Sequence, residues 1–212
     1  MVMALALLGI ASCGHPDPER RSRNTAAQEA AGTSAFTADS MLILRAREEK
    51  NALLQRDGSP IPQASRKSFL GLTYFPPASD FVFDLPLKKL EQPEPFSMGT
   101  TTGEIRTMRR YGTFTFTVGG VPCTLTAFTP LDHPTSLFIP FKDATNGGET
   151  YEAGRYIDME INEQNRYQLD MNLAYNPYCA YNPSYSCPLV PAENVLPVAI
   201  RAGEKLPPGG AH

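Results

Sequence analysis

Residues 112–128 read GTFTFTVGGVPCTLTAF, and the pattern of this stretch predicts a β-hairpin. Threonine alternates with phenylalanine in its first half, so a strand here would carry one polar face and one apolar face. Gly119 and Gly120 stand between the two halves, and paired glycines suit a two-residue hairpin turn because they adopt positive φ without strain. The first element that the sequence predicts is therefore an antiparallel pair of strands.

Short segments on both sides of this hairpin also predict strands. They cover residues 81–85, 105–111 and 137–141, and a further pair covers 155–161 and 166–173. After residue 173 the chain carries prolines at 177, 183, 188, 191 and 197, which favour a long ordered loop. With 20 prolines and 16 glycines in 212 residues, the predicted fold is mainly β. We expect an antiparallel sandwich or partly closed barrel, with an N-terminal helix and a long ordered C-terminal loop.

One longer helix is predicted before the strands. Thr37 or Ser40 can cap its N-terminus, and a turn beginning at Asp57 ends it after Gln55. We expect its buried stripe to be apolar and to consist of Met41, Leu42, Leu44, Leu53 and Leu54. A short helical turn is also expected around residues 63–67.

The strands at 155–161 and 166–173 predict the candidate site. If they pair as a hairpin, one register keeps both apolar sets on the core face, because a one-residue slip would turn one set outward. That register pairs Ile157 with Met171 and leaves a three-residue loop, residues 163–165. It also places Asp158 directly opposite Asp170, with Tyr156 beside Asn172.

Two carboxylates that face each other across a sheet repel, so this prediction requires a positive partner. A guanidinium from Arg155, Arg106, Arg109 or Arg110 could bridge them, and a divalent cation is the alternative. The pair is then either a structural ion pair on a solvated face or a functional acid–base or ligand site. The candidate site consists of Asp158, Asp170, Arg155, Glu149, Asn172 and Tyr156.

Two interpretations stay open for six tyrosines: they line a ligand cleft, or they pack proline-rich loops onto the domain. They are Tyr151, Tyr156, Tyr175, Tyr178, Tyr181 and Tyr185. Cys179 and Cys187 lie in the same region, and in an exported protein we expect them to form a disulfide. Free structural thiols are one alternative, and a catalytic thiol assisted by His133 is the other. Because Cys-x2-Cys pairs are absent from the sequence, we expect no metal and no cofactor.

The N-terminus predicts export. Residues 1–11 form an uncharged apolar run too short to span a bilayer, and Ile10-Ala11-Ser12-Cys13 resembles the lipobox of bacterial lipoproteins. The run lacks the preceding Lys or Arg of that pattern. We therefore predict a signal peptide and lipobox (1–13), a disordered tether (14–36), one mainly-β domain (37–206) and a disordered tail (207–212). Lipidation of Cys13 would anchor the protein to a membrane of the bacterial cell envelope, periplasmic or surface-exposed.

Five segments resemble a bacterial and archaeal family known as domain of unknown function family 1684. They are GLTYFPP from Gly71, TTGE from Thr101, PFKDATNGGETYEAGRY from Pro140, LDMNLAYNPYCAYNPSYSCPLVPAEN from Leu169 and LPVAIRAGEK from Leu196. The resemblance covers residues 53–205 and departs from the family pattern at residues 152–154, where two glycines around the alanine are expected. It implies no catalytic residue, because the family has no established activity.

Two classes of function follow from these observations. The first is an envelope lipoprotein module that binds a ligand or serves a structural role. The alternative is a hydrolase or lyase that uses a carboxylate cluster around Asp158 and Asp170. A formal net charge of −3, without a basic stripe, argues against nucleic acid as a partner.

Overall fold

The structure is a computed structural model that describes residues 40–207. The chain divides into two units, Met1–Met41 and Leu42–His212, and the second unit contains all the strands and all but the first two described residues of the N-terminal helix. The predicted signal peptide, tether and start of the domain lie outside the described residues, as does the predicted tail beyond Pro207. Among the described helices, none is long and apolar enough to cross a membrane.

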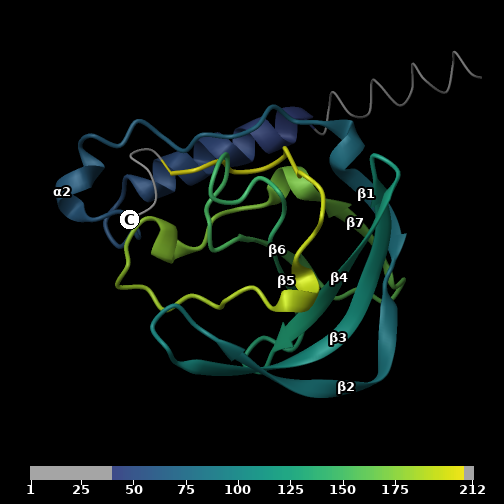
Figure 1. Cartoon of the computed structure of the whole chain (residues 1–212). Helices are drawn as coiled ribbons and strands as arrows, with labels where there is room; N and C mark the ends of the chain where they lie inside the picture. The colour runs from purple at the N-terminus through teal and green to yellow at the C-terminus, as the bar shows by residue number, and fades with distance from the viewer. Residues whose placement is uncertain (1–39, 208–212) are drawn as a thin grey trace, which may run out of the picture. The chain divides into compact units, whose positions relative to one another are not determined.

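The larger layer is a five-stranded antiparallel sheet in the order β2-β3-β4-β5-β6. Its strands are β2 (Lys88–Gly99), β3 (Ile105–Val118), β4 (Val121–Pro130), β5 (Ser136–Phe141) and β6 (Arg155–Glu160). The hairpin predicted at 112–128 is confirmed: Val118 pairs with Val121 across two glycines that both have positive φ. Figure 1 shows β2, β3 and β4 as long neighbouring strands.

Two features of this sheet differ from the prediction. The strands expected at 105–111 and 112–118 are one strand, β3, with a register shift between Arg110 and Gly112. An alanine at 112 would place its Cβ 2.7 Å from the Lys88 carbonyl oxygen, so glycine permits the close approach of β2. Strand β2 itself was not predicted because it is mostly exposed and contains Pro93 and Pro95, which only an edge strand tolerates.

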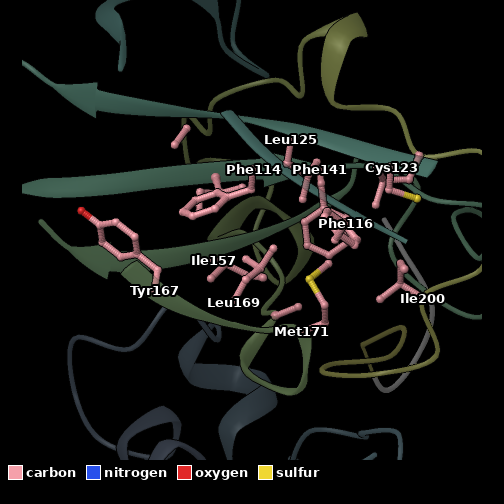
Figure 2. Close-up of a cluster of buried hydrophobic side chains, with 14 of the residues drawn as sticks. Phe114, Phe116, Cys123, Leu125, Phe141, Ile157, Tyr167, Leu169, Met171 and Ile200 are labelled. Carbon is pink, nitrogen blue, oxygen red and sulfur yellow. The ribbon is translucent and has the colours of Figure 1, made fainter. Parts of the chain in front are cut away.

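The smaller layer is an antiparallel pair, β1 (Val82–Pro86) and β7 (Arg166–Asp170). The main hydrophobic core lies against both layers (Figure 2): Phe114 and Leu125 come from the large sheet, and Tyr167 and Leu169 come from β7. The ring of Phe114 meets that of Tyr167 edge-on, with centroids 5.6 Å apart. The fold is therefore a mainly-β sandwich, as predicted, and its sheets do not close into a barrel.

The hairpin predicted for 155–173 is wrong. Strand β6 pairs with β5, where Asp158 is opposite Phe138, and β7 pairs with β1, where Asp170 is opposite Val82. The predicted faces are nevertheless correct for Ile157 and Leu169, which both contact the main core. Two strands can turn their apolar faces toward each other from opposite layers as well as side by side in one sheet. Alternation therefore specifies the face of a strand but not its partner.

The N-terminal helix covers residues 40–54 of the described chain, and α2 (Gln63–Arg66) follows it as predicted. The predicted apolar stripe is wrong except at Leu54, because Met41, Leu42, Leu44 and Leu53 are exposed. Polar side chains instead turn toward the domain: Arg47 donates to the Phe75 carbonyl oxygen at 2.9 Å, and Asn51 accepts from the Leu72 amide at 2.9 Å. Besides the buried Ile43 and Leu54, hydrogen bonds attach the helix to the domain, and hydrophobic periodicity cannot detect these.

The residues after β7 form the long ordered loop that was predicted. Three 3-10 turns, η2 (Met171–Leu173), η3 (Tyr178–Ala180) and η4 (Ala192–Asn194), interrupt it. Isolated bridges join it to the rest of the domain, including Tyr156 to Tyr175 and Thr100 to Pro188. The loop is therefore an integral layer over the sheet edges, and part of it covers the cavity described next.

Candidate functional site

A cavity of about 1100 Å³ lies between the five-stranded sheet and the long C-terminal loop. The sheet supplies eight residues to it: Arg106, Thr107, Met108, Pro130, Ser136, Phe138, Tyr156 and Asp158. The loop supplies Tyr175, Tyr178, Tyr185, Ser186, Cys187 and Pro188. Lys50 of the N-terminal helix and Asp132 and His133 of the β4–β5 turn also line it.

Alternation along β5 and β6 explains why these sheet residues face the cavity. Ile139 and Ile157 point into the main core. The residues next to them in each strand, Phe138 and Asp158, therefore point to the opposite face of the same sheet. Phe138 and Tyr156 belong to a second, smaller apolar cluster on that face. The sheet thus has apolar residues on both faces, and the loop covers part of the second face.

The cavity has an aromatic wall made of two groups of rings in contact. The Tyr156 ring stands edge-on to Phe138 and to Tyr175, with centroids 4.8 Å and 5.8 Å away. Farther along the loop, the rings of Tyr178 and Tyr185 stand edge-on to each other with centroids 5.4 Å apart. Such rings present apolar area together with hydroxyl groups, a combination that recurs in ligand sites.

Asp158 is the carboxylate at the centre of this arrangement. It accepts a short hydrogen bond from the Tyr175 hydroxyl group. The protein walls around it raise its pKa by desolvating the charged form, while the Tyr175 hydrogen bond partly offsets this rise. Desolvation and the neighbouring carboxylate raise the pKa of Tyr175, so its hydroxyl group stays protonated as the donor. The Lys50 ammonium lies 4.9 Å from the centre of the Tyr175 ring and pairs with the buried Glu204.

The two cysteines in the loop are free thiols, so the structure does not show the predicted disulfide. They lie next to each other: the Cys179 amide donates to the Cys187 sulfur at 3.2 Å. A hydrogen bond from the Cys179 thiol, helped by the charge of Arg106, lowers the pKa of Cys187 to about 6 although burial opposes the shift. Cys123 is buried in the main core, as a small apolar residue would be.

The predicted candidate site does not form one cluster, because β6 and β7 belong to different layers. Asp158 and Tyr156 line the large cavity, whereas the buried Asp170 accepts bonds from the backbone amide and side chain of Asn172. Arg155 is completely buried in an ion pair with Asp143, with 2.8 Å between nitrogen and oxygen. The shared positive partner predicted for the two aspartates is therefore wrong.

Glu149 lies outside the cavity. It forms a surface ion pair with Arg201, whose Nε is 2.9 Å from the carboxylate. Asn172, by contrast, lines a smaller cavity of about 200 Å³ beside the N-terminal helix. No group of three or more His, Cys, Asp or Glu side chains between residues 40 and 207 is arranged to hold a metal ion.

Sequence reasoning missed two parts of the cavity. The Asp158–Tyr175 hydrogen bond joins residues 17 positions apart, and Lys50 comes from the helix whose buried face was predicted wrongly. The density of tyrosines was the signal that could have located the cavity, and both interpretations of it apply. Tyr156, Tyr175, Tyr178 and Tyr185 line the cavity, whereas Tyr151 and Tyr181 pack into two other small clusters.

Comparisons with known proteins place this geometry in a family without assigning it an activity. A family model described as "Protein of unknown function (DUF1684)" matches residues 67–205. The chain is similar to the solution NMR structure of an uncharacterised protein from Haloarcula marismortui, with 35% sequence identity and a TM-score of 0.63. That match covers 80% of this chain and 95% of the other. The search of curated proteins found no match.

Proposed function

The chain belongs to the DUF1684 family of proteins of unknown function, and from this premise we propose that it is a ligand-binding module whose site is the cavity between the sheet and the C-terminal loop. One observation carries the proposal: a cavity of about 1100 Å³ combines aromatic walls with hydrogen-bonding side chains. Ligand sites typically have this mixture and enclose roughly 300–1000 Å³.

The side chains support a small ligand with an apolar body and several hydrogen-bond donors. The aromatic wall offers apolar area, and the Asp158 carboxylate is an acceptor that the Tyr175 hydroxyl group holds in place. Lys50 and Arg106 balance Asp132 and Asp158 along the lining, so the cavity does not select strongly for one sign of charge. A neutral molecule that carries hydroxyl or amide groups fits this lining best.

The alternative of a hydrolase or lyase has lost the feature on which it depended. It required a cluster around Asp158 and Asp170, but these residues lie on strands of different sheets. Burial raises the pKa of Asp158, and its hydrogen bond to Tyr175 suits an acceptor for a ligand as well as a proton acceptor. We therefore favour binding.

The location predicted from the sequence is part of the same proposal. The lipobox-like segment ending at Cys13 and the polar residues after it support an envelope protein attached to a membrane by lipid. In such a compartment we expect that a disulfide between Cys179 and Cys187 can form, because exported proteins meet oxidising conditions.

Binding can be tested with full-length protein carrying Cys13→Ser, which removes the lipidation site. A panel of neutral hydroxyl-bearing and aromatic compounds would be screened by saturation-transfer NMR, and the affinities of the hits would be measured by calorimetry. Asp158→Ala should weaken a genuine cavity ligand roughly tenfold or more, because a hydrogen bond to a charged group contributes about 1.5–3 kcal/mol.

The matched control is Asp84→Ala, because Asp84 is an exposed carboxylate on β1 that pairs with Arg166 away from the cavity. It should leave affinity unchanged. Tyr178→Ala removes a half-exposed ring of the aromatic wall and should also weaken binding. If the hits bind to Asp158→Ala and to Tyr178→Ala with the affinity that they have for the wild type, the cavity is not the binding site.

A further inference from the structure

Cys179 and Cys187 form a pair of thiols with different surroundings. The Cys179 amide donates to the Cys187 sulfur at 3.2 Å, and the Tyr151 hydroxyl group lies 3.9 Å from the Cys179 sulfur as a donor. Both cysteines are buried in a small cluster with Tyr151 and Ala180. The backbone at Cys187 is held by Thr101, whose side-chain oxygen accepts from the Cys187 amide at 3.1 Å. Hydrogen bonds from Tyr151 to Cys179 and from Cys187 to Thr101 therefore hold both cysteines in place.

Only one member of the pair faces the cavity. Cys187 lines it, whereas Cys179 is not among the lining residues. Arg106 lines the cavity too, and its guanidinium group donates to the carbonyl oxygen of Ser186, the residue before Cys187, at 2.7 Å. A molecule that enters the cavity can thus reach Cys187, and Cys179 lies behind it.

The two thiols also differ in protonation. The hydrogen bond from Cys179 is the main cause that lowers the pKa of Cys187 to about 6, and the Arg106 charge acts in the same direction. The same hydrogen bond, followed by desolvation, raises the pKa of Cys179. Both shifts act in the same sense: they favour the thiolate at Cys187 and the protonated thiol at Cys179.

Other titratable groups surround the pair. Tyr151 and Tyr156 remain protonated, because desolvation raises the pKa of each. Charged or titratable groups elsewhere on the cavity wall are Lys50, Asp132, His133, Asp158, Tyr175, Tyr178 and Tyr185. Arg106 is the positive group that acts directly on Cys187.

We propose that Cys187 is a nucleophile for small disulfides that enter the cavity and that Cys179 is its resolving cysteine. The Cys187 thiolate attacks one sulfur of a disulfide RSSR, so that a Cys187–SR mixed disulfide forms and RS⁻ leaves. The Cys179 sulfur then attacks the Cys187 sulfur, its proton passes to the departing thiolate, and RSH is released. The protein loses two electrons as the Cys179–Cys187 disulfide forms, and RSSR gains them as two thiols.

This reaction explains how the free thiols of the structure and the disulfide predicted from the sequence are related. The structure holds the reduced pair, and the predicted disulfide is its oxidised product. The product closes a loop over residues 180–186, which contains the cavity residues Tyr185 and Ser186. The proposal goes beyond ligand binding, and it requires only that a small disulfide can enter, so it can hold where the ligand proposal fails.

The order of attack can be tested with 2-hydroxyethyl disulfide and full-length protein carrying Cys13→Ser. In Cys179→Ser, a stable mixed disulfide should accumulate on Cys187, as mapped by mass spectrometry of non-reduced peptides. In Cys187→Ser, modification of Cys179 should be at least tenfold slower. The core residue Cys123 provides an internal control, because desolvation raises its pKa, and it should remain unmodified.

The pH dependence provides a sharper readout than the rate at one pH. Compared with an ordinary thiol, Cys187 has a larger thiolate fraction at pH 7 but a less nucleophilic sulfur. Its rate of reaction with a disulfide at pH 7 should therefore be only roughly three- to sixfold higher. The modification rate of Cys187 in Cys179→Ala should therefore be compared with that in wild type. In wild type the rate should rise with a midpoint of about 6, and without the Cys179 thiol the midpoint should move upward.

Two results would overturn the proposal. One is a mixed disulfide found first on Cys179 in wild-type protein quenched early with iodoacetamide. The other is a wild-type pH midpoint near the ordinary thiol value of 9.0. Both measurements use wild-type cysteines in the pair, so they stay decisive if a serine or alanine variant fails to fold.

Discussion

Among single residues, Arg155 has the most demanding environment. Its side chain is fully buried on β6 and forms an ion pair with the equally buried Asp143. The guanidinium group also donates to the carbonyl oxygens of Ile200, Ala202 and Glu204. One side chain thus attaches the end of the C-terminal segment to the sheet. Burial of a charge is costly, so this attachment depends on all partners being present.

We predict that Arg155→Met lowers the free energy of unfolding by about 3–5 kcal/mol, because it leaves the Asp143 charge buried without its partner. Denaturant unfolding followed by circular dichroism would measure the change. Arg201→Met is the matched control: it breaks an exposed ion pair with Glu149, which solvent screens, so it should change the free energy of unfolding far less. Equal effects of the two substitutions would contradict this account.

Asp158 gives a prediction about pH. Its folded-state pKa lies above the ordinary value of 3.8, so the folded protein holds this proton more tightly than the unfolded chain. The contribution of this carboxyl group to stability is therefore greatest at low pH, and it falls as the pH rises from 3.8 through the folded-state pKa.

Asp158→Asn removes this titration. The free energy of unfolding of the variant minus that of the wild type should increase with pH across this window and stay level on either side of it. Unfolding curves collected from about pH 3 to about pH 7 would test this. A difference that stays constant with pH, or that decreases as the pH rises, would mean that the folded-state pKa is not raised.

At the scale of an element, Gly203 determines how the C-terminal segment passes η2. Its φ is +77°, and an added Cβ would lie 2.5 Å from the Ala174 carbonyl oxygen and 2.9 Å from that of Met171. Both atoms belong to the backbone and cannot move away cheaply. Glycine is therefore needed for the backbone conformation and also for the close approach of the two segments.

We predict that Gly203→Ala destabilises the protein by about 2–5 kcal/mol, the sum of left-handed strain and overpacking. Gly103→Ala is the control, because Gly103 has a similar φ of +84° with open space around it. This control should cost only the strain, about 1–2 kcal/mol. If thermal and denaturant unfolding give the two variants the same stability, the close contact at Gly203 contributes nothing.

At the scale of the whole molecule, the proposals combine a sandwich domain, a cavity on the outer face of its larger sheet and an anchored N-terminus. The anchor rests on the lipobox-like segment alone.

We predict that wild-type protein is found in the membrane fraction of the producing cells and that Cys13→Ala moves it to the soluble fraction. Cys123→Ala, in a buried cysteine that lies far along the chain, should leave the distribution unchanged if the variant folds. Equal solubility of wild type and Cys13→Ala would exclude the anchor.

Local patterns in the sequence were sufficient for several parts of this structure. They predicted the glycine turn at 119–120, the helical turn at α2 and the ordered loop after residue 173. They also predicted which face of β6 is buried, so that Ile157 points to the core and Asp158 away from it. Each of these features depends on neighbours in the chain, through turn geometry or the two-residue period of a strand.

Only the tertiary structure decided which strands pair and which side chains meet. Every strand presents the same backbone donors and acceptors at its edge, so alternation could not distinguish a β6–β7 hairpin from pairing with β5 and β1. The partners of Asp158, Arg155 and Lys50 come from distant parts of the chain. A sequence shows that such charges need partners, but the choice among them depends on how the layers and the loop pack.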